Sequence, residues 1–429
     1  MMGTTKERPW KKKFFLIWCR QIFSLMGSNV VQFALIWWLT QMTGSAKVLA
    51  LATTAGFLPE ILLGPFAGAL VDRWNRKRVM IAADGLVALL TVGLVFLFWT
   101  GVETVWQIYV VMLLRSLGAV FHFAALQASI SLIVPESQLS RVAGLNQSLR
   151  GIVNIAGPPL GALLLSILPF YGALSVDVIT AILAIVPLCL VEIPQPENAN
   201  RTGTIAVSGL WADVRQGLRY VWSWPGLRGI IIMAVVINFL FTPAATMLPL
   251  PLLVKNYFQA GAWELSGLES AWGMGIVLGG LGLSVWGGFQ RQIITSLVGI
   301  VGMGTGFLMV GLAPVHLYPL AVAGFFVSGF MNPIVNGPFF AVIQKKVAPE
   351  MQGRVFTMFS SLVSAMVPLS MLVAGPLSDL LGVRAWFWIA GGGIMLTGVA
   401  AFFVPVIMDM ESDSPRVESA VYEAAMSEP

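Results

Sequence analysis

The side chains most able to do chemistry in this chain are a few ionisable groups that interrupt long apolar runs. Glu60, Asp84, Arg115 and Arg150 lie within such runs, whereas most other charged residues lie between them. An ionisable side chain at bilayer depth costs about 2.5–3.5 kcal/mol on insertion scales, so each one is a functional candidate. A carboxylate that binds either a proton or a cationic or polar ligand is the simplest device for antiport. These four residues are therefore our candidates for proton coupling.

Glu60 is the leading candidate for the coupling carboxylate. It lies twelve residues before Asp72, which belongs to a charged loop. At 1.5 Å per residue this places Glu60 roughly 18 Å deep, near the middle of a bilayer. A carboxyl in apolar surroundings exchanges a proton near neutral pH more readily than one beside an arginine. The alternative is a structural ion pair between Glu60 and an arginine that fixes helix packing.

Arg115 and Arg150 lie near the middle of their apolar runs, whereas Asp84 and Asp177 lie closer to the ends of theirs. A cation at this depth needs a compensating group. One role for Arg115 is therefore to neutralise Glu60 or Asp84.

The composition identifies a polytopic membrane protein. Of the 429 residues 57% are hydrophobic and 10% are charged, against about 25% charged residues in soluble domains. The net charge of +5 does not indicate nucleic-acid binding, because the basic residues lie in short loops between apolar runs.

Other classes of site find no support in the sequence. Cys19 and Cys189 both lie in apolar runs, so no disulfide framework is expected. His122 and His316 are far apart and lack metal-ligand spacing. No phosphate-binding Gly-rich Lys motif occurs. We therefore expect no metal, no cofactor and no enzyme activity.

Apolar runs long enough to cross a bilayer, which takes about 20 residues, follow one another along the whole chain. They predict twelve membrane-spanning helices at 14–40, 47–71, 79–100, 105–132, 139–167, 171–192, 228–254, 266–288, 292–313, 317–342, 351–381 and 384–408. Of the 25 Lys and Arg residues, only Lys47, Lys255 and Arg384 fall between spans on one side of this layout. This bias predicts that both termini are cytoplasmic.

The spans divide into two related halves. Pro135-Glu136, Arg141-Val142 and Gly157-Pro158 correspond to Pro349-Glu350, Arg354-Val355 and Gly375-Pro376. Such repeats indicate two parallel six-helix bundles. We predict a first bundle over 1–192, a cytoplasmic linker with an amphipathic interfacial helix over 193–227, a second bundle over 228–408 and a disordered cytoplasmic tail over 409–429.

A short basic turn joins the second and third predicted helices. Its residues are Gly68, Asp72, Arg73, Arg76 and Lys77. This spacing resembles the gating signature between helices 2 and 3 of the major facilitator superfamily. The usual second glycine is Asn75 here, a residue that also tolerates a left-handed turn. The alternative is an ordinary positively charged loop of another membrane protein.

Two further stretches resemble family motifs. Leu113-Leu-Arg-Ser-Leu-Gly-Ala119 is similar to a motif whose arginine takes part in proton transfer, which implies that role for Arg115. The fifth span is similar to the motif that distinguishes exporters, through Gly144, Gly157, Pro158 and Gly161. Physically, such small residues allow close helix contact and the proline bends the helix, so that one side of the cavity is sealed. Ordinary membrane packing is the alternative.

Uncharged polar side chains also occur at membrane depth. The cavity-lining candidates are Asn146, Gln147, Asn154, Asn238, Asn332 and Asn336. Others of this type hold helices together. A cavity lined by Phe, Met and Trp with few fixed charges suits a large amphipathic or lipophilic ligand better than a sugar phosphate or dicarboxylate.

Several segments of the first half resemble the macrolide-efflux branch of proton-coupled drug antiporters. They are Leu35-Ile-Trp-Trp-Leu-Thr40, Thr43-Gly-Ser-Ala46, Gly56-Phe-Leu-Pro59 and Gly64-Pro65. The resemblance implies export of a lipophilic drug from a bacterial cell across the cytoplasmic membrane, in exchange for protons. We expect a monomer. Export of a siderophore, a lysophospholipid or another metabolite is the first alternative. A membrane sensor or scaffold that transports nothing is the second.

Overall fold

The structure is a computed structural model that describes residues 8–71, 74–135, 138–190, 219, 221–222, 224–245, 249–347 and 349–411. All regular elements in these ranges are helical. The first bundle comprises α1 (Arg8–Thr43), α2 (Ala46–Val71), α3 (Arg76–Thr100), α4 (Val105–Ile133), α5 (Leu139–Ile167) and α6 (Phe170–Leu190). The second comprises α8 (Pro225–Ala245), α9 (Pro249–Leu252), η2 (Leu253–Tyr257), α10 (Ala262–Trp286), α11 (Gln292–Leu312), η3 (Val315–Leu317), α12 (Tyr318–Lys346), α13 (Pro349–Leu381), α14 (Val383–Phe402), α15 (Pro405–Met408) and η4 (Asp409–Glu411).

Ten stretches of the described helices are long and apolar enough to cross a membrane, and α5 and α6 contribute the shorter apolar stretches Gly151–Ile167 and Phe170–Val186. The predicted all-helical membrane fold is confirmed. Most boundaries of the predicted spans agree with the observed helices to within a few residues, because hydropathy and charged loops fix where a membrane helix can begin and end.

The seventh and twelfth predicted spans differ most from the observed elements. The seventh, 228–254, corresponds to α8, α9 and the π-helical turn η2, which belong to one candidate span over Pro225–Tyr257 whose residues 246–248 lie outside the described residues. The twelfth, 384–408, ends at Phe402, because Val404 is extended (φ −99°, ψ 101°) before Pro405, as a residue before proline prefers.

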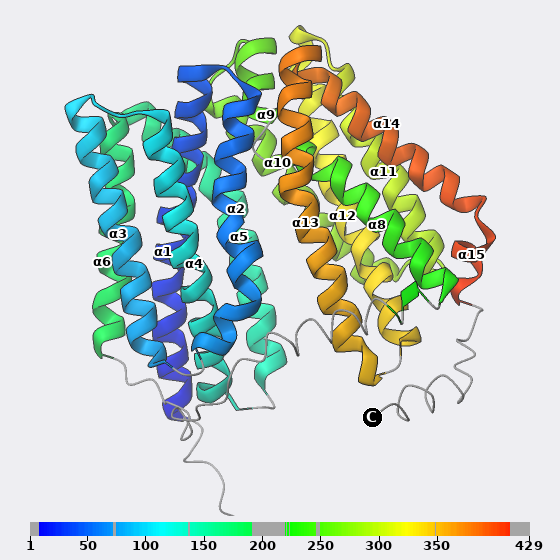
Figure 1. The fold of residues 1–429 in the computed structure, drawn as a ribbon, viewed down its shortest axis with the longest axis horizontal. Helices are drawn as coiled ribbons and strands as arrows, with labels where there is room; N and C mark the ends of the chain where they lie inside the picture. Colours follow the sequence, from blue (N-terminus) through cyan, green and yellow to red (C-terminus); the bar gives the residue numbers. More distant parts are fainter. Residues whose placement is uncertain are drawn as a thin grey trace, which may run out of the picture.

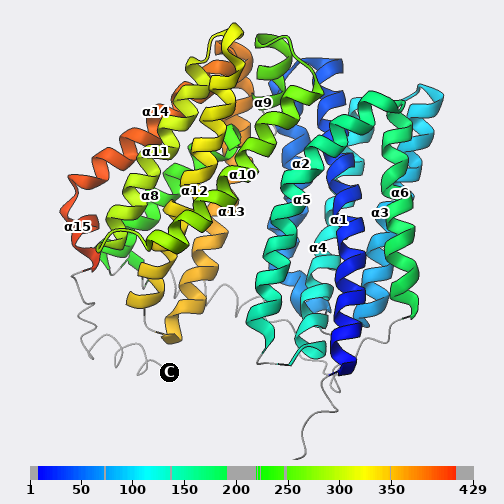
Figure 2. The same ribbon diagram turned by 180° about the vertical axis from the view of Figure 1, so that it is seen from behind.

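The two bundles meet along two helix pairs, α2 with α13 and α5 with α10. They approach each other at the end where α1 finishes and α2 begins, and they diverge towards the opposite end (Figures 1 and 2). We call the first of these the closed end and the second the open end. Most of the predicted linker 193–227 and the tail beyond Glu411 lie outside the described residues, so the amphipathic helix and the disordered tail stay predictions.

Close helix contact within the second bundle depends on glycine. A side chain at Gly279 of α10 would run into the backbone of Phe330 in α12, and one at Gly275 would run into Phe326. Small residues allow such approach where van der Waals packing holds helices together. This packing holds α10 and α12 together.

Candidate functional site

A cavity of about 990 Å³ lies between the bundles. Its walls come from α1, α2, α3, α4 and α5 on one side and from α13 on the other. The lining residues lie in the middle of these helices or in the half nearer the open end. We call this space the central cavity. Polar groups in its wall include Gln21, Asn29, Gln127 and Ser360, so it combines an apolar surface with dispersed hydrogen-bonding groups.

Glu60 lies in the wall of the central cavity, and its side chain is exposed there. Among the described residues, no ion pair or hydrogen bond holds its carboxylate. The alternative of a structural Glu–Arg pair is therefore not observed in that part of the chain. A carboxylate in this position is open to a ligand or a proton that enters the cavity.

Asp84 and His122 form a second acidic site in the same cavity. His122 Nε2 lies 3.4 Å from Asp84 Oδ1, and both side chains are largely buried but line the cavity. Sequence reasoning used His122 only to exclude a metal site. The signal that could have found it is an imidazole between two phenylalanines in a membrane helix, where an ionisable side chain is expected to be functional.

Arg115 pairs with Asp177. It pairs with neither Glu60 nor Asp84, the two carboxylates that the sequence suggested as its partners. Its Nη1 donates to Asp177 Oδ2 at 2.6 Å, and the side chains are 10% and 3% exposed. The Thr91 hydroxyl contacts both charged groups, and Ser28 donates to the second Asp177 oxygen at 3.4 Å. The network joins α1, α3, α4 and α6 inside the first bundle. This arrangement is typical of an ion pair that holds helices together.

The remaining candidates of the first bundle differ in position. Asn154 lines the central cavity. Asn146 is half-buried and is not among the residues that line it. The side chains of Gln147 and Arg150 lie outside the described residues, so their roles stay predictions.

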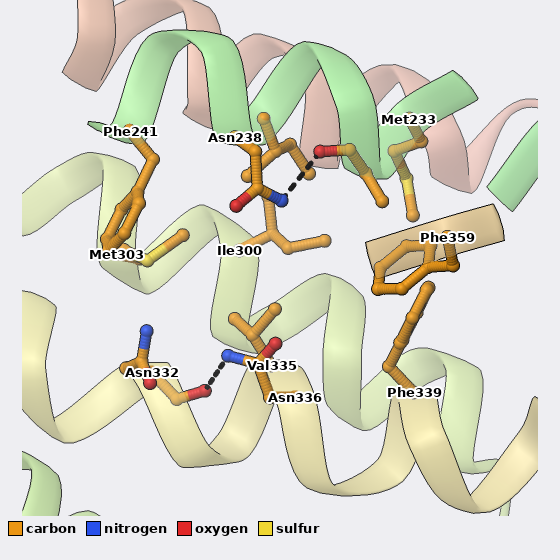
Figure 3. Close-up of a pocket in the computed structure, with 12 residues that line it drawn as sticks. Met233, Asn238, Phe241, Ile300, Met303, Asn332, Val335, Asn336, Phe339 and Phe359 are labelled. Atoms are coloured by element: carbon orange, nitrogen blue, oxygen red, sulfur yellow. Dashed lines mark hydrogen bonds between the residues drawn. The ribbon is translucent and has the colours of Figure 1, made fainter. Parts of the chain in front are cut away.

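Three predicted asparagines meet in a pocket of about 60 Å³ inside the second bundle. Asn238 of α8 faces Asn332 and Asn336 of α12 across this pocket (Figure 3). The Asn238 amide donates to the Ala234 carbonyl at 2.8 Å, and the Asn336 amide donates to the Asn332 carbonyl at 2.9 Å. Each of these amides satisfies its own helix and leaves its carbonyl oxygen to the pocket, which methionine and phenylalanine side chains otherwise line.

The basic turn is described in part. Asp72 and Arg73 lie outside the described residues, as does the packing around Gly68. Arg76 is buried and donates to the Ala128 carbonyl of α4 at 2.6 Å, and Lys77 follows it in α3. Asn75 has an extended backbone (φ −67°, ψ 107°) and accepts from the Arg78 N–H as the N-cap of α3. Asn75 is therefore not in a left-handed turn, and capping of α3 explains an asparagine at this position.

The exporter-like motif packs within the first bundle. A Cβ at Gly157 would lie 3.0 Å from Asn29 Cβ, and one at Gly161 would lie 2.8 Å from the Phe33 ring. These glycines therefore bring α5 against α1, with Pro158 inside the helix. The surroundings of Gly144 lie outside the described residues.

An aspartate from the second bundle caps a helix of the first at the closed end. The Asp379 carboxylate of α13 accepts the backbone N–H groups of Ala46 and Lys47 at 2.7 and 3.2 Å, and the Ser45 hydroxyl at 3.1 Å. These donors lie at the start of α2, with Ser45 directly before its first residue. A negative charge is stabilising at a helix N-terminus.

A lysine makes the complementary contact. Lys255 Nζ of η2 donates to the carbonyls of Thr40 and Gln41 at 2.9 and 2.8 Å, in the last turn of α1. A positive charge is stabilising there. Asp379 and Lys255 both belong to the second bundle, and each contacts the end of a helix in the first bundle. Sequence reasoning missed both contacts, because they depend on how the bundles are docked.

Glu269 of α10 is a further acidic residue that sequence reasoning did not select. One of its carboxylate oxygens is buried and has no hydrogen-bond partner among the described residues. Next to it, Ser270 donates to the Ile155 carbonyl of α5 at 3.2 Å. Glu269 therefore lies close to the junction of the two bundles. Its presence in an apolar run was the available signal.

Comparison with known proteins gives consistent results. The family described as Major Facilitator Superfamily matches residues 17–370. The chain is 32% identical over 406 residues to the macrolide efflux protein A of Streptococcus pyogenes, covering 95% of this chain and 99% of that protein. It is 28% identical to the multidrug efflux pump Tap of Mycobacterium tuberculosis, covering 92% and 94%.

Solved structures share the fold at low sequence identity. A bacterial homologue of the iron transporter ferroportin, in its inward-facing state, superimposes with a TM-score of 0.69 at 12% identity, covering 94% of this chain and 99% of that one. A bacterial homologue of the lysosomal transporter Spinster gives a TM-score of 0.66 at 11% identity, covering 94% and 97%.

Proposed function

The chain belongs to the major facilitator superfamily, and on that premise we propose that it is a secondary active transporter that exports lipophilic or amphipathic drugs of the macrolide type by proton antiport. Alternating access of the central cavity to the two sides of the membrane would carry the drug out. The protein lies in a bacterial cytoplasmic membrane, both of its termini are cytoplasmic, and it works as a monomer. The halves span 1–192 and 228–408, joined by 193–227 and followed by the tail 409–429.

One observation carries this proposal. The Glu60 carboxylate lies in the wall of a cavity shared by both bundles, and no cation neutralises it among the described residues. An uncompensated carboxylate at membrane depth is costly, and it is stabilised either by a proton or by a cationic ligand. Binding of one therefore excludes the other, which is what obligatory exchange requires.

The remaining polar groups of the cavity have supporting roles. The Asp84–His122 pair lies in the same wall and relays the proton towards or away from Glu60. The neutral side chains of Asn154 and Ser360 offer hydrogen bonds to the polar groups of a drug. A large apolar surface with few convergent polar groups is typical of sites for lipophilic ligands.

The substrate class is supported by the relatives, which are named as macrolide and multidrug efflux proteins. A cavity of about 990 Å³ is at the upper end of the range for small-molecule sites, so it can hold a large drug. A phosphorylated metabolite fits poorly, because among the described lining residues none is a lysine or arginine.

Drug accumulation in an efflux-deficient bacterial host tests the proposal. Cells that express the chain should accumulate less of a macrolide than cells with an empty vector, and an uncoupler should abolish the difference. Inhibitory concentrations across several drug classes then define the substrate range. Equal accumulation for every drug tried would contradict drug export and favour the export of a metabolite or a role without transport.

A further inference from the structure

A second cavity lies outside the central one, in a groove between α3 and α4 with a volume of about 580 Å³. Residues that line it include Trp74, Arg78, Ala82, Leu86, Leu117 and Phe121. We call it the α3–α4 groove. It begins beside Trp74, Asn75 and Arg78, where α3 starts at the open end of the molecule (Figure 1).

The groove is polar at its mouth and apolar along its length. Arg78 is exposed, and among the described residues its guanidinium has no ion-pair or hydrogen-bond partner. Trp74 and Phe121 lie beside it with ring centroids 5.9 Å apart. Further along, Ala82, Leu86 and Leu117 provide an apolar floor. Tryptophan and arginine at one depth are typical of the headgroup region of a membrane.

We propose that the α3–α4 groove binds an anionic phospholipid from the adjacent leaflet. Its phosphate group lies against Arg78, its glycerol region lies against Trp74, and one acyl chain follows the apolar floor. The free cation at the mouth selects a negative headgroup, because a basic residue near an anionic membrane surface favours binding by roughly fivefold. The apolar length of the groove selects a lipid chain over a soluble phosphate.

This lipid would lie directly behind the central cavity. Ala83 and Gly118 line both the groove and the cavity. A Cβ at Gly118 would lie 3.3 Å from the Ala83 carbonyl oxygen, so the helices touch there and only small residues separate the two spaces. An acyl chain in the groove therefore supports the cavity wall that carries Asp84, without blocking the cavity.

Thermal unfolding of the purified full-length protein in a neutral detergent tests the site. Phosphatidylglycerol should raise the unfolding midpoint more than phosphatidylcholine with the same acyl chains, since a ligand that binds only the folded state stabilises it. Native mass spectrometry should show one phosphatidylglycerol retained in preference to the rest. Inorganic phosphate should have no effect, and an equal effect of phosphate would overturn the assignment to a lipid.

Two variants separate the headgroup from the chain. Arg78→Gln should weaken phosphatidylglycerol binding by roughly fivefold, whereas Arg291→Gln, at an exposed arginine of the other bundle, should not. Ala82→Phe fills the groove from an exposed position and should abolish the retained lipid, whereas Ala400→Phe on the exposed side of α14 should not. Equal losses in the paired variants, or equal stabilisation by both lipids, would overturn the proposal.

Discussion

At the scale of single residues, the charged groups inside the first bundle fall into two kinds. Arg115 and Asp177 neutralise each other in a closed network, whereas Glu60 faces the central cavity without a partner among the described residues. Because the two charges of this pair already compensate each other, we expect neither group to bind or release a proton during transport. An uncompensated carboxylate can do so, and we therefore propose the coupling role for Glu60 and a structural role for Arg115.

Replacement of Glu60 by Gln should abolish coupled export while the protein still folds. The amide keeps the shape of the side chain but can neither ionise nor exchange a proton. We expect proton-driven drug uptake into inverted vesicles to fall at least tenfold, about 1.4 kcal/mol or more in coupling. Glu264→Gln is the matched control, because Glu264 only caps the start of α10 by accepting the Gly261 N–H. Normal antiport by Glu60→Gln would remove Glu60 from the coupling role.

Loss of one partner of the Arg115–Asp177 pair should destabilise the fold. Removal of one member of a buried pair leaves the other charge unpaired and costs about 3–5 kcal/mol. Arg115→Gln and Asp177→Asn should each lower the thermal unfolding midpoint, and the double variant should lose less than the sum of the two. Additive losses, or stable single variants that have lost proton coupling, would assign Arg115 to the proton path instead.

At the scale of helices, sequence patterns predict the length of a helix better than its rotation about its own axis. Apolar runs gave most boundaries to within a few residues, because the bilayer sets the length of a span. The partner of Arg115 could not be predicted in this way. Asp177 becomes its partner only because the helix faces that carry Arg115 in α4 and Asp177 in α6 both point towards Thr91 of α3. The end of α14 at Phe402 was in principle visible as Pro405, but the hydropathy of the run concealed it.

Two glycines of α5 should respond in opposite ways to alanine. A Cβ at Gly161 would lie 2.8 Å from the Phe33 ring, which is 1% exposed and has no room to move. Gly161→Ala should therefore cost about 1–3 kcal/mol through overpacking. Gly151 has open space around it, so Gly151→Ala should be neutral or stabilising by up to about 1 kcal/mol. Thermal unfolding of both variants checks this, and equal effects would mean that α5 does not approach α1 so closely.

At the scale of the whole molecule, the two ends of the transporter differ in how the bundles are joined. Asp379 and Lys255 connect the bundles through helix ends at the closed end, while the bundles diverge towards the open end (Figure 2). The basic residues of the loops predict that the closed end faces the outside. On that prediction, we expect access from the outside to require that both contacts break.

Loss of these contacts should shift the molecule towards a state open to the outside. A charged group at a helix end contributes about 1 kcal/mol, up to about 2 kcal/mol where it is partly buried, so each loss should raise the outward-open population roughly fivefold. A cysteine at Ser364, which lines the central cavity, reports this state in a background with Cys19→Ser and Cys189→Ser. A membrane-impermeant thiol reagent added outside should label it faster in Asp379→Asn and in Lys255→Met.

Arg384→Gln is the matched control, because the Arg384 guanidinium donates to the Gly311 carbonyl and stacks on Tyr257 within the second bundle. If the control labels as fast as the other two, the effect is a general loosening of that surface, and the helix-end contacts do not hold the molecule closed.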